Sequence, residues 1–210
     1  MRGAMINLGI LISGRGSNMT AILSAIRRRV IKNVRPSIVI SNKSNAPGLR
    51  IASEKFKIPA KVILSNGMKG WDYDQQIASV LQDYGVTPRR GLICLAGFLR
   101  IMSPEFVRAY KMRIMNIHPS LLPAFSGLHA QKQAIEYGVK VTGCTVHFVD
   151  EGLDSGPIIA QKAVPILDSD TEETLSSRIL KQEHRLYTKS INLFAEGKIF
   201  FKGRSVLVRS

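Results

Sequence analysis

Short apolar runs alternate with amphipathic stretches along most of the chain. This alternation is typical of βαβ units that wind around a parallel sheet. The apolar runs predict strands at residues 6–13, 37–41, 61–64, 91–95 and 112–118. Two later stretches, 143–149 and 157–165, alternate as neighbouring antiparallel strands do. The pattern predicts an α/β fold: an open, mostly parallel twisted sheet with helices on both faces and antiparallel strands in the C-terminal half.

Helices are expected between these strands, where apolar residues such as Met19, Ile22 and Ile26 recur at helical spacing. The predicted helices cover residues 18–28, 47–56, a stretch from 72, a stretch from 103, 128–137, and a long terminal segment that ends near 197. The tail, residues 198–210, is expected to pair as a small hairpin.

Polar residues mark where several of these helices begin. Ser103 precedes a proline, which suits a cap followed by Pro at the first helical position. Asp72 with Gln75, and Asp170 with Glu173, have the three-residue spacing of capping pairs. We therefore expect one helix to start at Asp72 and the terminal helix to start at Asp170.

Composition limits the class of protein. The chain has 210 residues and 45% of them are hydrophobic, so a single domain over 1–210 can bury a sizeable core. Cys94 and Cys144 each lie in an apolar run, which predicts buried free thiols in a reducing cytosol. No segment approaches the roughly 20 apolar residues of a membrane span, and the run at 8–12 is too short for a signal peptide. A cytoplasmic protein without membrane contact is expected.

The charge is strongly basic, with 30 Lys and Arg against 15 Asp and Glu and a net charge of +15. A positive field favours anionic partners such as nucleic acid, acidic lipid, or phosphorylated and carboxylated metabolites. The basic residues are scattered, however, and the clusters at 27–29 and 89–90 are not interleaved with aromatics. These clusters are expected to be solvated surface, so specific nucleic-acid binding is not predicted.

A glycine-rich turn, residues 13–18, joins the first strand to the first helix. Glycines allow a ligand to approach the backbone closely, and a helix N-terminus attracts a phosphate. Met19 stands where a dinucleotide-binding motif has its third glycine, so one phosphate fits better than a dinucleotide. The alternative is an ordinary tight turn with Ser17 or Asn18 as the helix cap.

A second candidate site lies at the end of the strand at 112–118. Residues two apart in a strand share a face, so Asn116 and His118 project together. Pro119 then ends the strand just where the polar pair emerges. An Asn amide and a protonated His can both donate hydrogen bonds to one oxygen, as stabilisation of a tetrahedral oxyanion requires.

A carboxylate near His118 would favour the charged imidazole. Asp154 is the candidate, in the acidic and glycine-rich loop 150–157. The sequence places no obvious Ser or Cys nucleophile and no zinc-binding cluster, so direct group transfer without metal is expected. The alternatives are a buried polar pair beside a turn for Asn116 and His118, and an Asx-turn for Asp154.

Together, these motifs resemble the phosphoribosylglycinamide formyltransferase family, the folate-dependent enzymes of purine biosynthesis. The resemblance rests on residues 116–123, followed by Gly127-Leu128-His129 and then 154–159. It extends to residues 12–18, 41–43, 95–101 and 182–184, in the same order along the chain. The family implies a Rossmann-like formyltransferase fold, with a phosphate-binding half at 1–111 and a catalytic and folate-binding half at 112–210.

The resemblance also implies a reaction and roles for named residues. The amine of glycinamide ribonucleotide would attack the formyl group of 10-formyltetrahydrofolate, the co-substrate. Asn116 and His118 would stabilise the oxyanion, while Asp154 would hold His118 charged and help relay the proton that leaves the amine.

Binding roles follow from the same resemblance. The ribonucleotide would be held by four residues, with Glu183 contacting it from the terminal helix and three others cradling its phosphate: Gly16, Ser17 and Asn18. The folate pocket would be lined by Asn116 and residues 99–102, with a basic contact from Lys69. The residues at 99–102 are Leu99, Arg100, Ile101 and Met102.

The sequence departs from the family in one loop. Gln131 stands where relatives often have a second His after Gly-Leu, and residues 124–126 lack the usual basic residue and proline. Methionyl-tRNA formyltransferase and formyltetrahydrofolate hydrolase share the Asn-His-Asp site, but each has an additional domain for which this chain is expected to lack room. A basic nucleic-acid-binding module is the rival from another class, distinguished by salt-sensitive RNA binding without formyl transfer. The sequence is compatible with a monomer or a homodimer.

Overall fold

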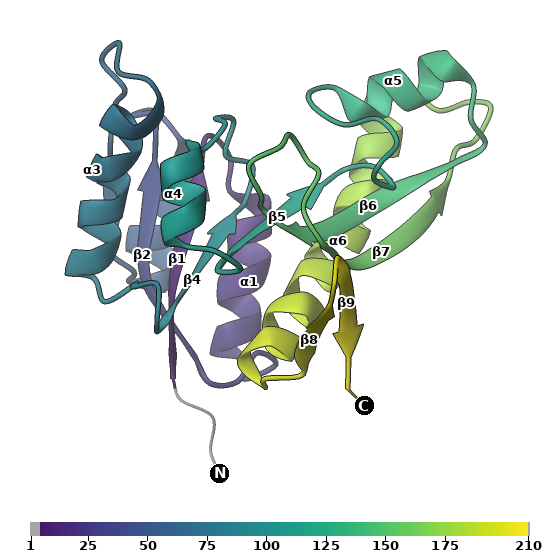
Figure 1. The fold of residues 1–210 in the computed structure, drawn as a ribbon. Coiled ribbons are helices and arrows are strands. Elements are labelled where there is room, and N and C mark those ends of the chain that lie inside the picture. The colour runs from purple at the N-terminus through teal and green to yellow at the C-terminus, as the bar shows by residue number, and fades with distance from the viewer. Residues whose placement is uncertain (1–4, 210) are drawn as a thin grey trace.

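The computed structural model describes residues 5–209, and its centre is one twisted sheet (Figure 1). Within that range seven strands form the sheet, in the order β3-β2-β1-β4-β5-β6-β7. They are β1 (Ile6–Ile12), β2 (Val34–Ser41), β3 (Ala60–Val62), β4 (Gly91–Leu95), β5 (Ile114–His118), β6 (Val141–Phe148) and β7 (Ile158–Pro165). The first five run parallel, and β6 lies antiparallel to both β5 and β7. The predicted fold class is confirmed.

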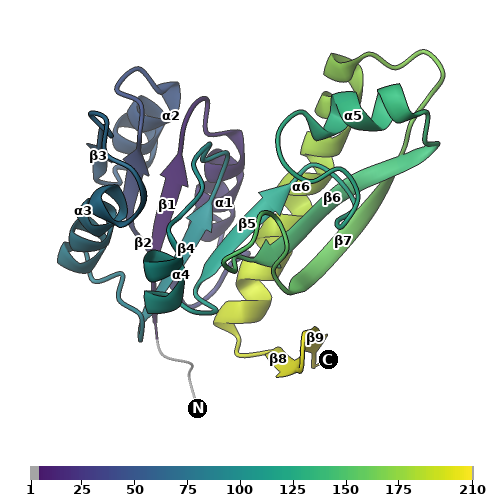
Figure 2. The ribbon, with the colours of Figure 1, turned by 45° about the horizontal axis from the view of Figure 1, so that its top comes forward.

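Helices cover both faces of the sheet (Figures 1 and 2). They are α1 (Ser17–Arg27), α2 (Pro47–Arg50) with a π-helical continuation η1 (Ile51–Lys55), α3 (Gly70–Asp83), α4 (Pro104–Ala109), α5 (Ala130–Tyr137) and α6 (Glu172–Ala195). Ile10 of β1 belongs to the core under α1 and α6, whereas its neighbour Leu11 belongs to the core under α3 and α4. Both side chains are fully buried, as expected for strands covered on both faces.

The strand register brings three strand ends to one edge of the sheet. Leu11 of β1 pairs with Leu95 of β4, which in turn pairs with Asn116 of β5. The chain leaves β1 towards β2 on one side and returns to β4 on the other, so the topology switches between β1 and β4. Ligands of open α/β sheets bind beyond the carboxyl ends of the strands at such a switch.

Two predicted helix starts are wrong. Helix α3 begins at Gly70 with Lys69 as its cap, and the Gln75 side chain donates to the Asp72 carbonyl oxygen inside the first turn. Helix α6 begins after Thr171.

The start of α6 has a physical explanation. The Asp170 carboxylate makes an ion pair with Arg178 at 2.6 Å, which occupies the carboxylate oxygens. Thr171 and Thr174 instead form a reciprocal capping box, in which each side chain accepts a hydrogen bond from the other residue's backbone N–H. Sequence spacing alone could not choose between two acceptors that are adjacent in the chain.

A third helix start also differs: α5 begins at Ala130 rather than residue 128, because His129 adopts a left-handed conformation with φ 58°. It ends at Gly138, as expected.

The C-terminal tail forms the predicted hairpin, with β8 (Ile199–Lys202) antiparallel to β9 (Ser205–Val208). Phe201 of the hairpin packs against Phe148 at the end of β6, with ring centroids 5.4 Å apart.

Cys94 and Cys144 are buried free thiols, as predicted, and burial raises the pKa of each to about 12. In the part of the chain from 5 to 209, no helix is both long and apolar enough to cross a bilayer. The functional division at residue 112 stays a prediction, since one sheet runs through both halves.

The capping box of α6 is open to a stability test. Thr171→Ala should lower the free energy of unfolding by about 1 kcal/mol, because it removes the acceptor of the Thr174 backbone N–H. Glu173→Ala is the control: it removes an exposed first-turn carboxylate and should cost only about 0.3 kcal/mol. Urea unfolding of both variants measures the difference, and equal losses would contradict the cap.

Candidate active site

Asn116 and His118 project from the carboxyl end of β5, as predicted. Met115, the residue before them, points into the core and is fully buried, whereas Asn116 is only partly buried. The His118 side chain is 6% exposed, so it lies at the inner end of a cleft and not on the open surface. Because alternate residues of a strand point to the same face, both polar side chains project to one place.

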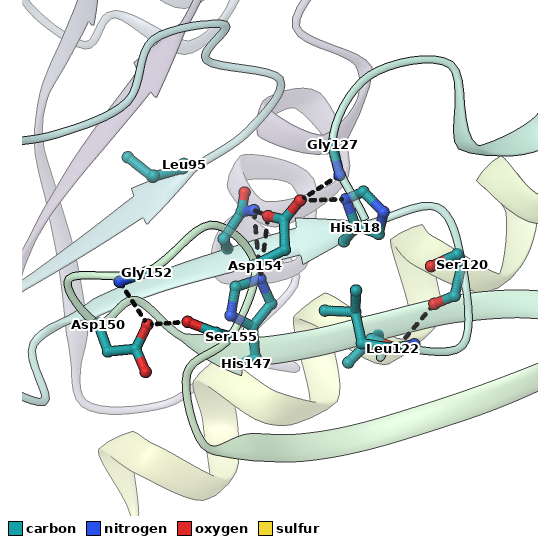
Figure 3. A network of polar contacts seen from close by, with 12 residues as sticks. Leu95, His118, Ser120, Leu122, Gly127, His147, Asp150, Gly152, Asp154 and Ser155 are labelled. Carbon is teal, nitrogen blue, oxygen red and sulfur yellow. Dashed lines mark hydrogen bonds and ion pairs between the residues drawn. The ribbon is translucent and has the colours of Figure 1, made fainter. Parts of the chain in front are cut away.

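Asp154 meets this pair from the loop between β6 and β7 (Figure 3). Its Oδ2 lies 3.3 Å from His118 Nδ1 and accepts a 2.8 Å hydrogen bond from the Gly127 backbone N–H. Its Oδ1 lies 3.5 Å from Asn116 Nδ2. The structure thus brings together the three residues that the sequence singled out.

The loop that carries Asp154 is internally braced. The Asp150 carboxylate accepts hydrogen bonds from the Ser155 hydroxyl at 2.6 Å and from the Gly152 backbone N–H at 3.1 Å (Figure 3). Asp154 itself is in the left-handed region with φ 49°, which its neighbours must stabilise. Arg204, in the turn of the C-terminal hairpin, donates to the Ser155 carbonyl oxygen.

His118 has an oxygen acceptor at each ring nitrogen. Nδ1 faces Asp154, and Nε2 lies 2.8 Å from the carbonyl oxygen of Phe125. A doubly protonated ring can donate to both acceptors at once. Phe125 belongs to the segment 124–126, where the sequence departs from the family, and its backbone is left-handed with φ 54°.

Sequence reasoning missed His147, which lies beside the predicted trio. His147 on β6 pairs directly with Asn116 on β5, and its Nε2 is 3.3 Å from Asn116 Nδ2 and 3.8 Å from Asp154 Oδ1. Burial lowers the pKa of His147, although the Phe148 carbonyl and the Asp154 carboxylate offset part of the shift. The ring is therefore neutral at pH 7: Nδ1–H donates to the Phe148 carbonyl oxygen at 2.9 Å, and Nε2 accepts from Asn116. An antiparallel pairing of 112–118 with 143–149 would have revealed it, but the register was not readable from the sequence.

The glycine-rich turn ends at Gly16, which is the N-cap of α1 with φ 70°. No side chain among the described residues caps this helix, so the alternative in which Ser17 or Asn18 is the cap is wrong. A Cβ atom at position 16 would lie 3.0 Å from Met19 Cε and 3.2 Å from Gly48 Cα. Glycine is therefore required both by the backbone angle and by the close approach of the chain around 48.

Asn18 and Glu183 meet at the same end of the sheet. Asn18 Nδ2 donates a 2.8 Å hydrogen bond to Glu183 Oε2, although the two residues lie 165 positions apart. Burial raises the pKa of Glu183, and the bond from Asn18 offsets part of that effect. Both residues line the cleft that contains Asn116 and His118.

His184, next to Glu183, faces a second groove between α1 and α6, which Ser17 also lines. Its Nε2 atom is buried and has no hydrogen-bond partner among residues 5–209. The sequence motif at 182–184 included His184 but assigned it no role.

The cleft has a volume of about 650 Å³. Its walls include five of the six residues predicted to bind folate: Asn116, Leu99, Arg100, Ile101 and Met102. Leu128 and Leu153 add apolar surface to the lining. Lys69 lies at the cap of α3 and is outside the set of described residues that line the cleft.

Known proteins resemble this chain over almost its whole length. A model of the Formyl transferase family matches residues 6–191. The chain belongs to this family. The phosphoribosylglycinamide formyltransferase of Escherichia coli (strain K12) is 40% identical over 194 residues, which cover 92% of this chain and 89% of that protein. The resemblance read from the motifs is confirmed.

Solved structures of the formyl transferase family share the fold. Glycinamide ribonucleotide transformylase 1 from Symbiobacterium toebii matches with a TM-score of 0.92 and 47% identity, covering 98% of this chain and 95% of that one.

The trifunctional purine biosynthetic protein adenosine-3 of Drosophila pseudoobscura pseudoobscura is 48% identical in sequence over 195 residues. Those residues cover 91% of this chain but 14% of that protein, so the chain spans a small part of the trifunctional relatives.

The neutral state of His147 can be measured. In an NMR titration its ring should lose its proton with a midpoint below the ordinary value of 6.5, because burial disfavours the imidazolium. Asp154→Asn should lower the midpoint further, since it removes a negative charge that favours protonation. The unfolded chain binds this proton at the ordinary value, so the site lowers the free energy of unfolding as the pH falls below 6.5. A midpoint at or above 6.5 would contradict the assignment.

Proposed function

We propose that this protein transfers the formyl group of 10-formyltetrahydrofolate to the amine of glycinamide ribonucleotide. The observation that carries the proposal is one continuous cleft with three kinds of wall. Asn18 and Glu183 line one part and residues 99–102 another, and the cluster of Asn116, His118 and Asp154 also faces the space. Such a cleft can hold a ribonucleotide and a folate with their reacting groups over the cluster.

The proposed chemistry is direct attack of the amine on the formyl carbon. The carbonyl oxygen becomes an oxyanion in the tetrahedral intermediate, and Asn116 and His118 donate hydrogen bonds to it. His118 Nε2 reaches this oxygen by giving up its bond to the Phe125 carbonyl. Asp154 remains on Nδ1, where it orients the ring and helps relay the proton that the amine loses to the folate nitrogen. The intermediate then collapses as the bond between the formyl carbon and that nitrogen breaks, and tetrahydrofolate leaves with the proton.

The ribonucleotide is placed by the turn before α1. Gly16 bends the backbone so that the first N–H groups of α1 face outward, where they and the helix dipole attract a phosphate. In the proposal Ser17 and Asn18 complete this cradle, while Glu183 accepts hydrogen bonds from the sugar. A buried carboxylate already bonded to Asn18 is a fixed acceptor for hydroxyl groups.

The folate is placed against residues 99–102. Leu99 and Ile101 are 62% and 76% exposed, which is high for large apolar side chains beside a cleft. An aromatic ring system bound between these residues and Leu128 or Leu153 would cover them. Lys69 is not assigned to the folate, because it lies at the cap of α3 and is not among the described residues that line the cleft.

The proposal makes the partners small molecules and places the reaction in the cytoplasm, with a monomer or a homodimer equally compatible. It assigns no specific nucleic-acid ligand to the net charge of +15.

Formyl transfer by the purified protein tests the function. Wild-type protein should convert glycinamide ribonucleotide and 10-formyltetrahydrofolate to products, whereas His118→Ala and Asn116→Ala should each lower kcat about 100- to 1,000-fold, as loss of an oxyanion donor does. Asp154→Asn should lower kcat as well. Asp168→Asn is the matched control, because Asp168 is 93% exposed and bonded to Lys140 away from the cleft. Wild-type turnover in both His118→Ala and Asp154→Asn would refute the assigned roles.

The phosphate turn has its own test with a matched pair of glycines. Gly16→Ala forces a left-handed alanine, which costs about 1–2 kcal/mol; movement of the turn that relieves this strain should draw its N–H groups away from the phosphate, so KM for the ribonucleotide should rise by up to about tenfold. KM for the folate should stay within about twofold. Gly14→Ala is the control, because a Cβ there meets no described atom within 4 Å. Equal effects of both variants on the two KM values would argue against a phosphate at Gly16.

A further inference from the structure

We propose that Tyr73 and Asp74, near the N-terminal end of α3, are positioning residues that hold residues 99–102 in place as the folate-facing wall of the cleft. Neither residue lines the cleft. The inference rests on the proposed function, because that function assigns this wall to the folate. The proposal is that α3 affects the affinity for the folate and not the rate of the chemical step.

Asp74 fixes the C-terminal end of the wall. Its Oδ2 accepts a 2.6 Å hydrogen bond from the backbone N–H of Ser103, the residue that follows Met102. Asp74 is 2% exposed and Ser103 is 5% exposed, so water cannot readily replace this bond. Ser103 also caps α4 by accepting from the Phe106 N–H, so the same residue joins the wall to α4.

Tyr73 supports the middle of the wall. The Arg100 guanidinium lies over the Tyr73 ring, 4.1 Å from its centroid, and donates to the Met68 carbonyl oxygen at 3.4 Å. The ring is itself immobile, because Tyr73 is fully buried and its hydroxyl donates to the Ile63 carbonyl oxygen at 2.7 Å. A guanidinium stacked on this ring holds the end of the Arg100 side chain against α3.

The N-terminal end of the wall is held from the other side. The Leu99 N–H donates to the Ser13 hydroxyl at 2.8 Å, and Ser13 belongs to the turn after β1. The wall is thus fixed at three points, two of them from α3. Between these points Leu99 and Ile101 remain exposed, so no core packing of their own holds them in position.

The identity of residue 74 supports a role beyond packing. Burial raises the pKa of Asp74, which means that the surroundings disfavour its charge. A buried carboxylate is costly, and an asparagine could accept the same hydrogen bond without that cost. The charge gives a stronger bond to the Ser103 N–H and attracts Arg100, so it serves both fixed points of the wall.

Steady-state kinetics separates positioning from simple destabilisation. Asp74→Ala should raise KM for 10-formyltetrahydrofolate about tenfold, leave KM for the ribonucleotide within twofold and change kcat less than threefold. Asp74→Asn keeps an oxygen acceptor but loses the charge, so it should recover only part of the folate affinity. Tyr73→Phe keeps the ring under Arg100 but loses the bond to Ile63, so it should raise KM for the folate less than Tyr73→Leu, which removes the ring.

Asp72→Ala is the matched control, since Asp72 is an exposed carboxylate in the same helical turn. Hydrogen exchange of the Ser103 amide gives a readout independent of catalysis: it should speed up in Asp74→Ala but not in Asp72→Ala. If Asp74→Ala does not fold, exchange of the Ser103 amide can still be measured in Asp74→Asn and Tyr73→Leu, and these two variants then decide the test.

Two outcomes would overturn the proposal: the same kinetics and exchange in the Asp74 and Asp72 variants, or a parallel loss of affinity for both substrates in Asp74→Ala that follows its thermal stability. An inactive wild-type protein would instead reject formyl transfer itself, and the exchange measurement would then still decide whether Asp74 holds the wall.

Discussion

The carboxylate of Asp154 is the point at which the separate parts of the site meet. It reaches His118 at the end of β5, the backbone of Gly127 in the loop before α5, and Asn116 one step back along the strand. Strand β5 fixes Asn116 relative to His118, but the loop at Gly127 comes from a separate segment. Asp154 joins that loop to the strand, and the position of Asp154 depends on the loop that Asp150 and Arg204 brace.

The side chains around Asp154 are buried, and this burial determines which hydrogen bonds they make. The Asp154 and His118 side chains are 11% and 6% exposed, so their polar atoms are poorly hydrated and must be satisfied by each other and by nearby groups. Burial lowers the pKa of His147, and a positive charge on His118 would lower the pKa of His147 further. Two adjacent histidines thus take different roles: one can donate from both nitrogens, and the other accepts from Asn116.

The sequence predicted what local periodicity and short motifs determine. The alternation of apolar runs gave the strands, and the spacing of Asn116 and His118 gave their shared face. It could not give His147, because its place beside Asn116 is a matter of register between two strands. Nor could it give the start of α6, where a distant partner, Arg178, occupies the carboxylate of Asp170. The brace on residues 99–102 was equally hidden, since its two ends are 29 residues apart and neither Tyr73 nor Asp74 belongs to a motif. In each case the prediction failed because it depended on a contact between distant parts of the chain.

The bond between His118 Nε2 and the Phe125 carbonyl bears on how the proposed catalysis would work. It satisfies a buried donor in the absence of substrate, so the imidazolium incurs no unpaired group while the cleft is empty. A neutral formyl oxygen that replaces the Phe125 carbonyl exchanges one carbonyl acceptor for another and gains little. As that oxygen becomes an anion, the same hydrogen bond becomes charge-assisted on both sides and strengthens, while the bond to Phe125 would not. The contact therefore removes binding energy from the ground state and leaves it available in the transition state, which is the condition for a donor to raise kcat instead of merely lowering KM.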